Sequence, residues 1–317
     1  MRRTGLIAIA AVALSVCLGG PARGQAGDVT VEIAAGGLIF VNDPLIAIDS
    51  LEVLVRPDEI RATYVVKSSA PKPRTILVAF ALPDLDMAAL GDQQVQLAAS
   101  QSANFVAATF AADGIPVAVE LEQRALAFGL DVSRHLEAAR IPLSPTTKAI
   151  ADRLTRLPPA VKTDLAERGV VRIEDDRVVP NWTLKTTANW RQTFQPRRPV
   201  TVVLTYAPVA AKAPFASAAL DGLRKSHCID SATEAAITRR IAAKAGNVTL
   251  GWLSYALTAG SNWAAPLASF RLLIEKPDID TIVATCRPGL RPVGPTALEW
   301  NAIGFSPDED LHVLYAR

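Results

Sequence analysis

Cysteine and histidine are the scarce side chains in this sequence that could bind a metal, form a disulfide or act as nucleophiles. The cysteines are Cys17, Cys228 and Cys286, and His227 directly precedes Cys228. A zinc ion could use His227, Cys228 and Cys286, but zinc-binding sequences normally separate paired ligands by several residues. We therefore favour a disulfide between Cys228 and Cys286, and we expect no metal and no other cofactor.

Local patterns of the common hydrolases and nucleotide-binding enzymes are missing. No serine completes Gly-x-Ser-x-Gly, and neither His-Glu-x-x-His nor Gly-x-x-x-x-Gly-Lys-Ser/Thr occurs. Glu120 and Glu122 place two carboxylates on one side of an expected strand, which could serve acid–base chemistry. Alternating charges of this kind usually mark a solvated strand face. We predict no catalytic residue and favour a protein that is not an enzyme.

Ser261, Asn262 and Trp263 are the best candidates for a binding surface. They lie in a small polar loop between the apolar segments Trp252–Leu257 and Phe270–Glu275. Tryptophan offers a large amphipathic ring for contacts with proteins or sugars, and it serves equally well as a plug in a core. The loop therefore predicts recognition of a protein partner or, alternatively, of a small molecule or glycan.

The first 26 residues are typical of a cleavable export signal. Arg2 and Arg3 precede an apolar segment too short to span a bilayer comfortably, and small residues favour cleavage after Ala26. Loss of residues 1–26 removes Cys17 and three arginines. The basic residues then fall from 33 to 30 against 31 acidic ones, so the net charge changes from +2 to −1.

This signal predicts a periplasmic or secreted protein. A nearly neutral mature chain gives no electrostatic case for nucleic acid binding, and no later apolar segment predicts stable membrane insertion after cleavage. We expect the partner to be another envelope or periplasmic protein. An oxidising compartment favours pairing of the two remaining cysteines, and closing so long a loop would stabilise the fold by about 4 kcal/mol.

Alternating apolar residues predict a mainly β fold. Ile60–Lys67 alternates strictly, and Thr75–Leu82 is its expected partner strand across a proline-containing turn. Asp113 and Gly114 separate two apolar segments and predict a hairpin, because both residues tolerate positive φ. Val200–Tyr206 is another clear strand.

Helix signals interrupt this pattern twice. Ser144 is an expected N-cap with Pro145 at the first helical position, and Asp230 or Ser231 would cap a short helix over 232–244. We predict β-sandwich-like layers with a helical insertion and one further short helix. The expected regions are the signal peptide 1–26, an N-terminal β region 27–130, the helical insertion 131–169 and a C-terminal β region 170–317.

Short motifs along the mature chain carry a resemblance to a known family. They are Gly36-Gly37-Leu38-Ile39-Phe40, Ala81-Leu82-Pro83-Asp84-Leu85, Glu122-Gln123-Arg124-Ala125, Trp190-Arg191-Gln192-Thr193-Phe194, Cys228-Ile229-Asp230, Tyr255-Ala256-Leu257-Thr258, Asn262-Trp263 and Thr285-Cys286. Together they resemble an exported bacterial family, the domain of unknown function 4424. The resemblance covers nearly all of the mature chain and implies a periplasmic location without an established activity.

A second set of motifs is similar to the vault-inter-alpha-trypsin β-sandwich domain. The motifs are Leu82-Pro83, the Asp113-Gly114 hairpin, Arg124-Ala125 and Thr205-Tyr206. This resemblance implies an interaction or scaffolding module, with 131–168 as an insertion and no metal-ion-dependent adhesion domain after it. Our leading hypothesis is an exported, non-enzymatic interaction or scaffolding module. The alternative is a periplasmic protein that binds, or hydrolyses, a small molecule or glycan.

Overall fold

The protein is mainly β, as the alternating sequence predicts. The structure, a computed structural model, describes residues 34–36, 38–40, 43–92, 97–175, 177–214, 220, 222–243, 248–258 and 265–317. The expected signal peptide and the loop residues Ser261, Asn262 and Trp263 lie outside the described residues.

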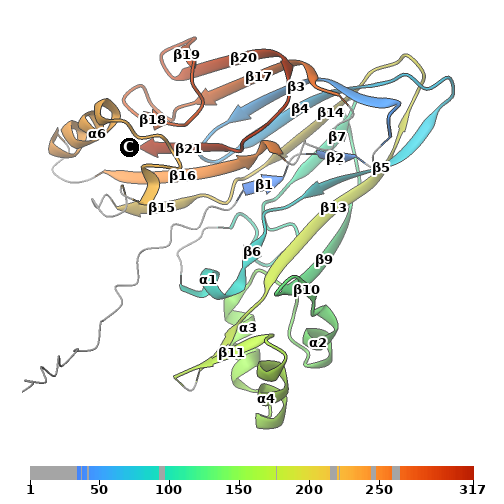
Figure 1. Cartoon of the computed structure of the whole chain (residues 1–317), viewed down its shortest axis with the longest axis vertical. Helices are drawn as coiled ribbons and strands as arrows, with labels where there is room; N and C mark the ends of the chain where they lie inside the picture. The colour runs from blue at the N-terminus through green and yellow to red at the C-terminus, as the bar shows by residue number, and fades with distance from the viewer. Residues whose placement is uncertain are drawn as a thin grey trace, which may run out of the picture.

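The largest sheet has eight strands and forms a layer shared by the whole molecule (Figure 1). Its order is β19-β20-β17-β3-β4-β14-β7-β8, with only β17 and β3 parallel. The strands are β3 (Ile46–Val55), β4 (Ile60–Ser68), β7 (Thr109–Ala112), β8 (Ile115–Pro116), β14 (Val200–Tyr206), β17 (Leu267–Glu275), β19 (Arg291–Pro292) and β20 (Ala297–Phe305). Ile60, Ala62, Tyr64 and Val66 of β4 are fully buried on one face, as their alternation predicts.

A second sheet packs against the β4, β14 and β7 side of the shared sheet. Its order is β10-β9-β13-β5-β2, and β6 also pairs with β13. The strands are β2 (Leu38–Phe40), β5 (Arg74–Ala81), β6 (Leu85–Asp86), β9 (Glu120–Ala127), β10 (Leu130–Asp131) and β13 (Thr183–Phe194). Aromatic rings join the two layers: Phe80 lies 5.8 Å from Phe110 and 5.4 Å from Tyr206 between ring centroids, and Trp190 lies 5.3 Å from Phe110.

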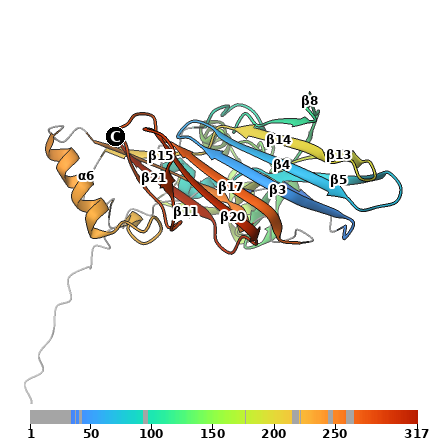
Figure 2. The same ribbon diagram turned by 90° about the horizontal axis from the view of Figure 1, so that it is seen from above.

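A third sheet packs against the same face of the shared sheet, beside the second one (Figure 2). Its order is β1-β16-β21-β18, and β15 also pairs with β16. The strands are β1 (Ala34–Gly36), β15 (Ala211–Pro214), β16 (Thr249–Ala256), β18 (Ile282–Ala284) and β21 (Leu311–Ala316). Buried tyrosines connect the layers: the hydroxyls of Tyr64 and Tyr255 lie 2.9 Å apart, and Tyr315 Oη donates to the Val55 carbonyl at 3.4 Å.

A helical arm projects from the second sheet (Figure 1). It contains α2 (Ser133–Ala138), α3 (Thr147–Thr155), α4 (Pro159–Glu167) and the hairpin of β11 (Val171–Glu174) with β12 (Arg177–Pro180), and α1 (Met87–Asp92) lies nearby. Leu136, Ile150, Leu154 and Leu165 are almost fully buried and belong to the main core. The arm helices lie within 131–169, where the sequence predicts helices, and they pack as an extension of the β core.

Helix α6 (Ser231–Ala243) covers the face of the third sheet that points away from the shared sheet. A small second core lies between them and includes Leu223, Ile237 and Leu314. Asp230 is the N-cap, because its Oδ1 accepts a hydrogen bond from the Thr233 N–H at 2.7 Å. This hydrogen bond lowers the pKa of the Asp230 carboxyl.

The expected start of α3 was wrong. The helix begins at Thr147, with Thr146 as N-cap, and not after Ser144. Ser144 Oγ instead accepts a hydrogen bond from the Thr146 N–H at 3.1 Å. A serine that closes such a local turn competes with helix formation, which explains why its cap-like sequence does not mark the helix end.

The expected pairing of Ile60–Lys67 with Thr75–Leu82 was also wrong. These segments form β4 and β5, which belong to different sheets of the sandwich. The proline-containing connection between them crosses from one layer to the other. Local alternation predicts each strand but carries no information about its neighbour in space.

The Asp113-Gly114 hairpin is confirmed. Asp113 and Gly114 have φ values of 50° and 78° between the paired strands β7 and β8. The Asp113 carboxylate also accepts a hydrogen bond from the Thr201 N–H at 2.9 Å. The second apolar segment does not form one strand: β8 ends at Pro116, and β9, which begins at Glu120, belongs to the second sheet. Glu120 and Glu122 are exposed, in keeping with a solvated face.

Candidate functional site

The predicted binding loop connects two different sheets. β16 belongs to the third sheet and β17 to the shared sheet, and Ser261, Asn262 and Trp263 lie between them in the chain, outside the described residues. Before the loop, Asp310 Oδ1 accepts hydrogen bonds from the Thr258 N–H at 2.9 Å and the Thr258 hydroxyl at 2.6 Å. The binding role of the three loop residues therefore stays a prediction.

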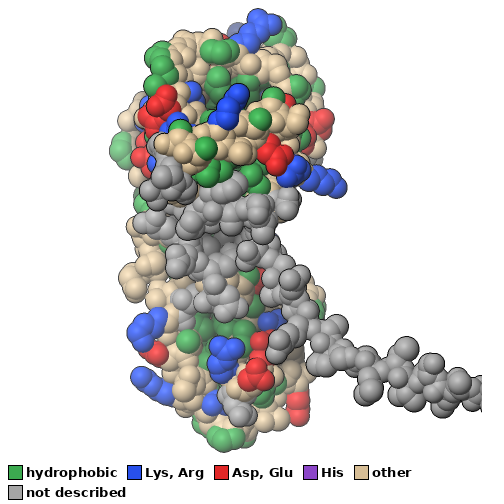
Figure 3. Space-filling model, turned by 90° about the vertical axis from the view of Figure 1, so that its left-hand side faces the viewer, with side chains coloured by type: hydrophobic (Ala, Val, Ile, Leu, Met, Phe, Trp, Pro, Cys, Tyr) green, Lys and Arg blue, Asp and Glu red, His purple; other side chains and the backbone are tan. Residues whose placement is uncertain are grey.

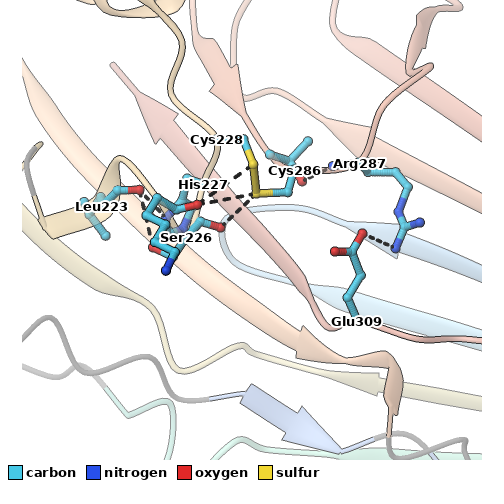
Figure 4. Close-up of a disulfide and its surroundings, with 9 residues drawn as sticks. Leu223, Ser226, His227, Cys228, Cys286, Arg287 and Glu309 are labelled. Atoms are coloured by element: carbon cyan, nitrogen blue, oxygen red, sulfur yellow. Dashed lines mark hydrogen bonds and ion pairs between the residues drawn. A yellow bond between two sulfur atoms is a disulfide. The ribbon is translucent and has the colours of Figure 1, made fainter.

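Cys228 and Cys286 form a disulfide, with their Cα atoms 4.9 Å apart (Figure 4). Cys228 lies just before α6 and Cys286 just after β18, so the bond ties the α6 segment to the edge of the third sheet. Both sulfur atoms are consumed by this bond and are not available as thiolate ligands. Within the described parts of the chain, no group of three or more His, Cys, Asp or Glu side chains could hold a metal ion.

His227 is fully buried beside the disulfide (Figure 4). Its Nδ1 lies 3.0 Å from Ser226 Oγ and 3.3 Å from the Leu223 carbonyl, and its ring centroid is 6.0 Å from that of His312. Burial, together with the nearby His312, lowers the pKa of His227 to about 4. The side chain is therefore neutral near pH 7, where it packs as part of the fold.

Ser254 and His312 form a cross-strand pair that sequence inspection did not nominate. Ser254 Oγ lies 2.8 Å from His312 Nδ1, and the residues are paired across β16 and β21. Ser254 is only 3% exposed, so its hydroxyl is not open to a substrate. The carboxylate of Asp310, two residues from His312, is bonded to Thr258. The pair lacks the accessible nucleophile that acyl transfer needs.

A polar pocket of about 440 Å³ lies at the carboxyl ends of β3, β17 and β21. Its lining residues are Arg56, Pro57, Asp58, Glu275, Lys276, Pro277 and Arg317. Arg56 Nε donates to Glu275 Oε2 at 2.6 Å, and this bond raises the pKa of Arg56. The residues come from three distant parts of the sequence, and no spacing pattern could have identified them.

The arm also exposes three large apolar side chains, Phe128, Leu130 and Ile173, and we call this set the arm tip. These side chains are 82%, 70% and 55% exposed. Phe128 lies in the turn between β9 and β10, and its ring covers Gly169, where an added Cβ would come within 2.5 Å of Phe128 Cε2. The only sequence signal for this surface is an apolar Phe128-Gly129 pair within a turn.

These features define a disulfide-pinned, mainly β protein in which one large sheet backs two smaller ones. The chain belongs to the family described as "Domain of unknown function (DUF4424)", whose model matches residues 26–314. This confirms the family resemblance drawn from the sequence motifs.

Other comparisons add less. Comparison with proteins of curated function gives no match. Among solved structures, the chain is similar to a Legionella pneumophila protein whose crystal structure is described as that of a "putative nutrient binding protein". The two share 14% sequence identity and a TM-score of 0.47, over 90% of this chain and 71% of that one. None of the helices in the described ranges has the length and apolar character needed to cross a membrane.

Proposed function

We propose that the protein is an exported, non-enzymatic interaction module that binds another envelope protein through its arm tip. The observation that carries the proposal is the exposure of Phe128, an aromatic side chain with 82% of its surface accessible. Leu130 on β10 and Ile173 on β11 are also more than half exposed. Figure 3 shows hydrophobic side chains at the surface of both the upper part of this face and the lower part, where the arm lies. Large aromatic residues dominate the binding energy of many protein interfaces.

The backbone at the arm tip supports this role. Ala127 and Leu130 are paired, so Phe128 and Gly129 form a two-residue turn, with φ values of 51° and 79°. Positive φ suits glycine but is unfavourable for a bulky residue such as phenylalanine. A costly conformation that keeps an aromatic ring at the surface favours a function for that ring over a role in stability.

Charges near the arm tip are paired within the arm. Arg168 Nη2 lies 2.9 Å from Asp164 Oδ1, and Arg172 Nε lies 2.8 Å from Glu174 Oε1. These exposed pairs leave little net charge to attract a partner over a distance. We therefore expect binding by apolar burial, with an association rate and affinity that depend weakly on salt.

Site-specific photo-crosslinking in the native envelope tests the proposal. A photoreactive phenylalanine analogue is placed at Phe128, and in a matched protein at Ile303, which is 92% exposed on β20 and distant from the arm. We expect one recurrent envelope protein to be captured from position 128 and not from position 303, with a yield that is stable at high salt.

A substitution then tests the energetics. Phe128→Ser should weaken binding of the captured partner by tenfold or more, because burying a phenylalanine side chain contributes about 1.5–3 kcal/mol. Ile303→Ser is the control and should leave the affinity unchanged. Equal capture from both positions, or unchanged affinity of the Phe128→Ser protein, would overturn the proposal.

A further inference from the structure

We infer that the polar pocket at the end of β3, β17 and β21 binds a small zwitterion, a solute carrying one carboxylate and one ammonium group. The pocket is lined by residues at or just after the ends of β3, β17 and β21, and Figure 1 shows β21 well away from the helical arm. Its volume of about 440 Å³ is within the range of small-molecule sites. The inference does not depend on the proposed partner contact.

The positive charge of Arg56 in the pocket is neutralised by carboxylates of the protein itself. Arg56 donates to Glu275 at 2.6 Å and lies 3.4 Å from Glu59. This guanidinium therefore has carboxylate partners on two sides. It forms part of the pocket wall and is not free to recruit a ligand.

Charges of both signs remain available. Among the residues that the structure describes, Lys276 Nζ donates only to the uncharged Ile279 carbonyl, at 2.8 Å. The side chains of Arg317 and Asp58 make no hydrogen bond or ion pair with any residue that the structure describes, although both line the pocket. A simple anion would satisfy Lys276 and Arg317 but would be repelled by Asp58, and a simple cation would meet the opposite problem. A zwitterion complements both.

The backbone holds these groups in place before a ligand arrives. Arg317 and Thr249 exchange two backbone hydrogen bonds of 3.0 Å, and the Lys276 N–H donates to the Thr296 carbonyl at 2.7 Å. Pro57 and Pro277 restrict the two turns that frame the pocket. Such pre-organisation lowers the entropic cost of binding.

A small recess adjoins the pocket and shares Pro57 and Arg317 with it. Leu253 and Tyr315 also line this recess. At about 10 Å³ the recess has room for little more than one water molecule, so the methylene groups of a short ligand would lie against Pro57 and Pro277 of the main pocket. Its charged ends would face Asp58 and Arg317. The ligand class is therefore a short aliphatic zwitterion of the amino-acid type.

A series of four-carbon solutes tests this inference by changing charge at nearly constant size. Isothermal titration calorimetry at low salt compares 4-aminobutyrate, succinate and 1,4-diaminobutane. The protein used begins at Gly27, after the expected signal peptide, and carries its tag at that end, because Arg317 lines the pocket. We expect 4-aminobutyrate to bind with a Kd of about 1 mM or tighter, and the other two at least tenfold more weakly.

Substitutions test which pocket residue binds each charged group of the ligand. Arg317→Gln and Asp58→Asn should each weaken 4-aminobutyrate binding at least tenfold, whereas Asp58→Asn should strengthen succinate binding. Lys67→Gln is the matched control, since Lys67 pairs with Asp49 on the shared sheet and does not line the pocket. Unchanged thermal unfolding of each variant shows that the fold is retained.

Three outcomes would overturn the inference. Succinate binding as tightly as 4-aminobutyrate, with no effect of Asp58→Asn, would make the pocket a plain anion site. Tighter binding of 1,4-diaminobutane would make it a cation site. Absence of heat from all three solutes at about 10 mM would show that the pocket binds none of them usefully.

Discussion

The two helical regions of this protein are attached to the β layers in different ways. The arm helices bury Leu136, Leu154 and Leu165 in the main core, and the arm contains no cysteine. Helix α6 buries only Ile237, over a small second core, and the disulfide ties the residues just before it to β18. Of the two helical regions, the one with less apolar burial is therefore the one held by a covalent bond. Four predictions test this comparison.

The largest effect should come from breaking the disulfide. Cys228→Ser is expected to lower the free energy of unfolding by up to about 4 kcal/mol, because the unfolded chain regains the entropy of a long loop. Chemical denaturation of the oxidised protein measures it. Cys228→Ser/Cys286→Ser should be as destabilised as the single variant. If reducing agent leaves the unfolding midpoint of the native protein unchanged, the bond does not stabilise the fold.

Truncation of a buried leucine should separate the two helical regions. Leu136→Ala in the arm is expected to cost about 3 kcal/mol of global stability, since it opens a cavity in the main core. Ile237→Ala is the matched change in α6. It should mainly speed hydrogen exchange over 231–243, with a smaller loss of global stability. The reverse pattern would mean that the arm, and not α6, is the more loosely attached region.

Acid should weaken the α6 region through His227. Its pKa is lowered to about 4 in the folded protein, against about 6.5 when unfolded, so the unfolded state binds more protons between these values. Stability should therefore fall by about 2 kcal/mol between pH 7.5 and pH 5.

The control for this pH effect is another histidine. His227→Gln should remove most of that loss, whereas His135→Gln, at an exposed position in α2, should not. Equal pH dependence of the native protein and the His227→Gln variant, measured by denaturant unfolding, would exclude His227 as the source.

The smallest effect concerns the start of α6. Asp230→Ala should lower the midpoint of thermal unfolding slightly, because the Thr233 N–H loses its acceptor. Asp230→Asn keeps an acceptor oxygen and should lower the midpoint less. Thermal unfolding can resolve both. If the two variants are equally stable, the cap contributes its charge near the helix end more than its hydrogen bond.

Much of the local structure follows from the sequence. The alternation of Ile60, Ala62, Tyr64 and Val66 predicts the buried face of β4, and the Asp113-Gly114 pair predicts a turn that needs positive φ. These signals are reliable because they depend on neighbours within a few residues. The start of α3 shows their limit, because Ser144 closes a turn and does not cap the helix.

The candidate sites were harder to predict from the sequence than the local structure was. The pairing of Cys228 with Cys286 could be predicted because the expected mature chain contains no other cysteine. The polar pocket could not, since Asp58, Lys276 and Arg317 belong to three separated segments. The predicted loop with Trp263 stays untested, and the arm tip depends on the contact of Phe128 with Gly169.

The sequence by itself determined the mainly β class, the family and the cysteines available for a disulfide. Only the tertiary structure decided that β4 and β5 lie in opposite layers, that β17 runs parallel to β3, and that one sheet backs two others. Strand alternation shows which face of each strand is buried. Which strands become neighbours in a sheet depends instead on packing and hydrogen bonding between segments distant in the chain. No local pattern encodes these contacts.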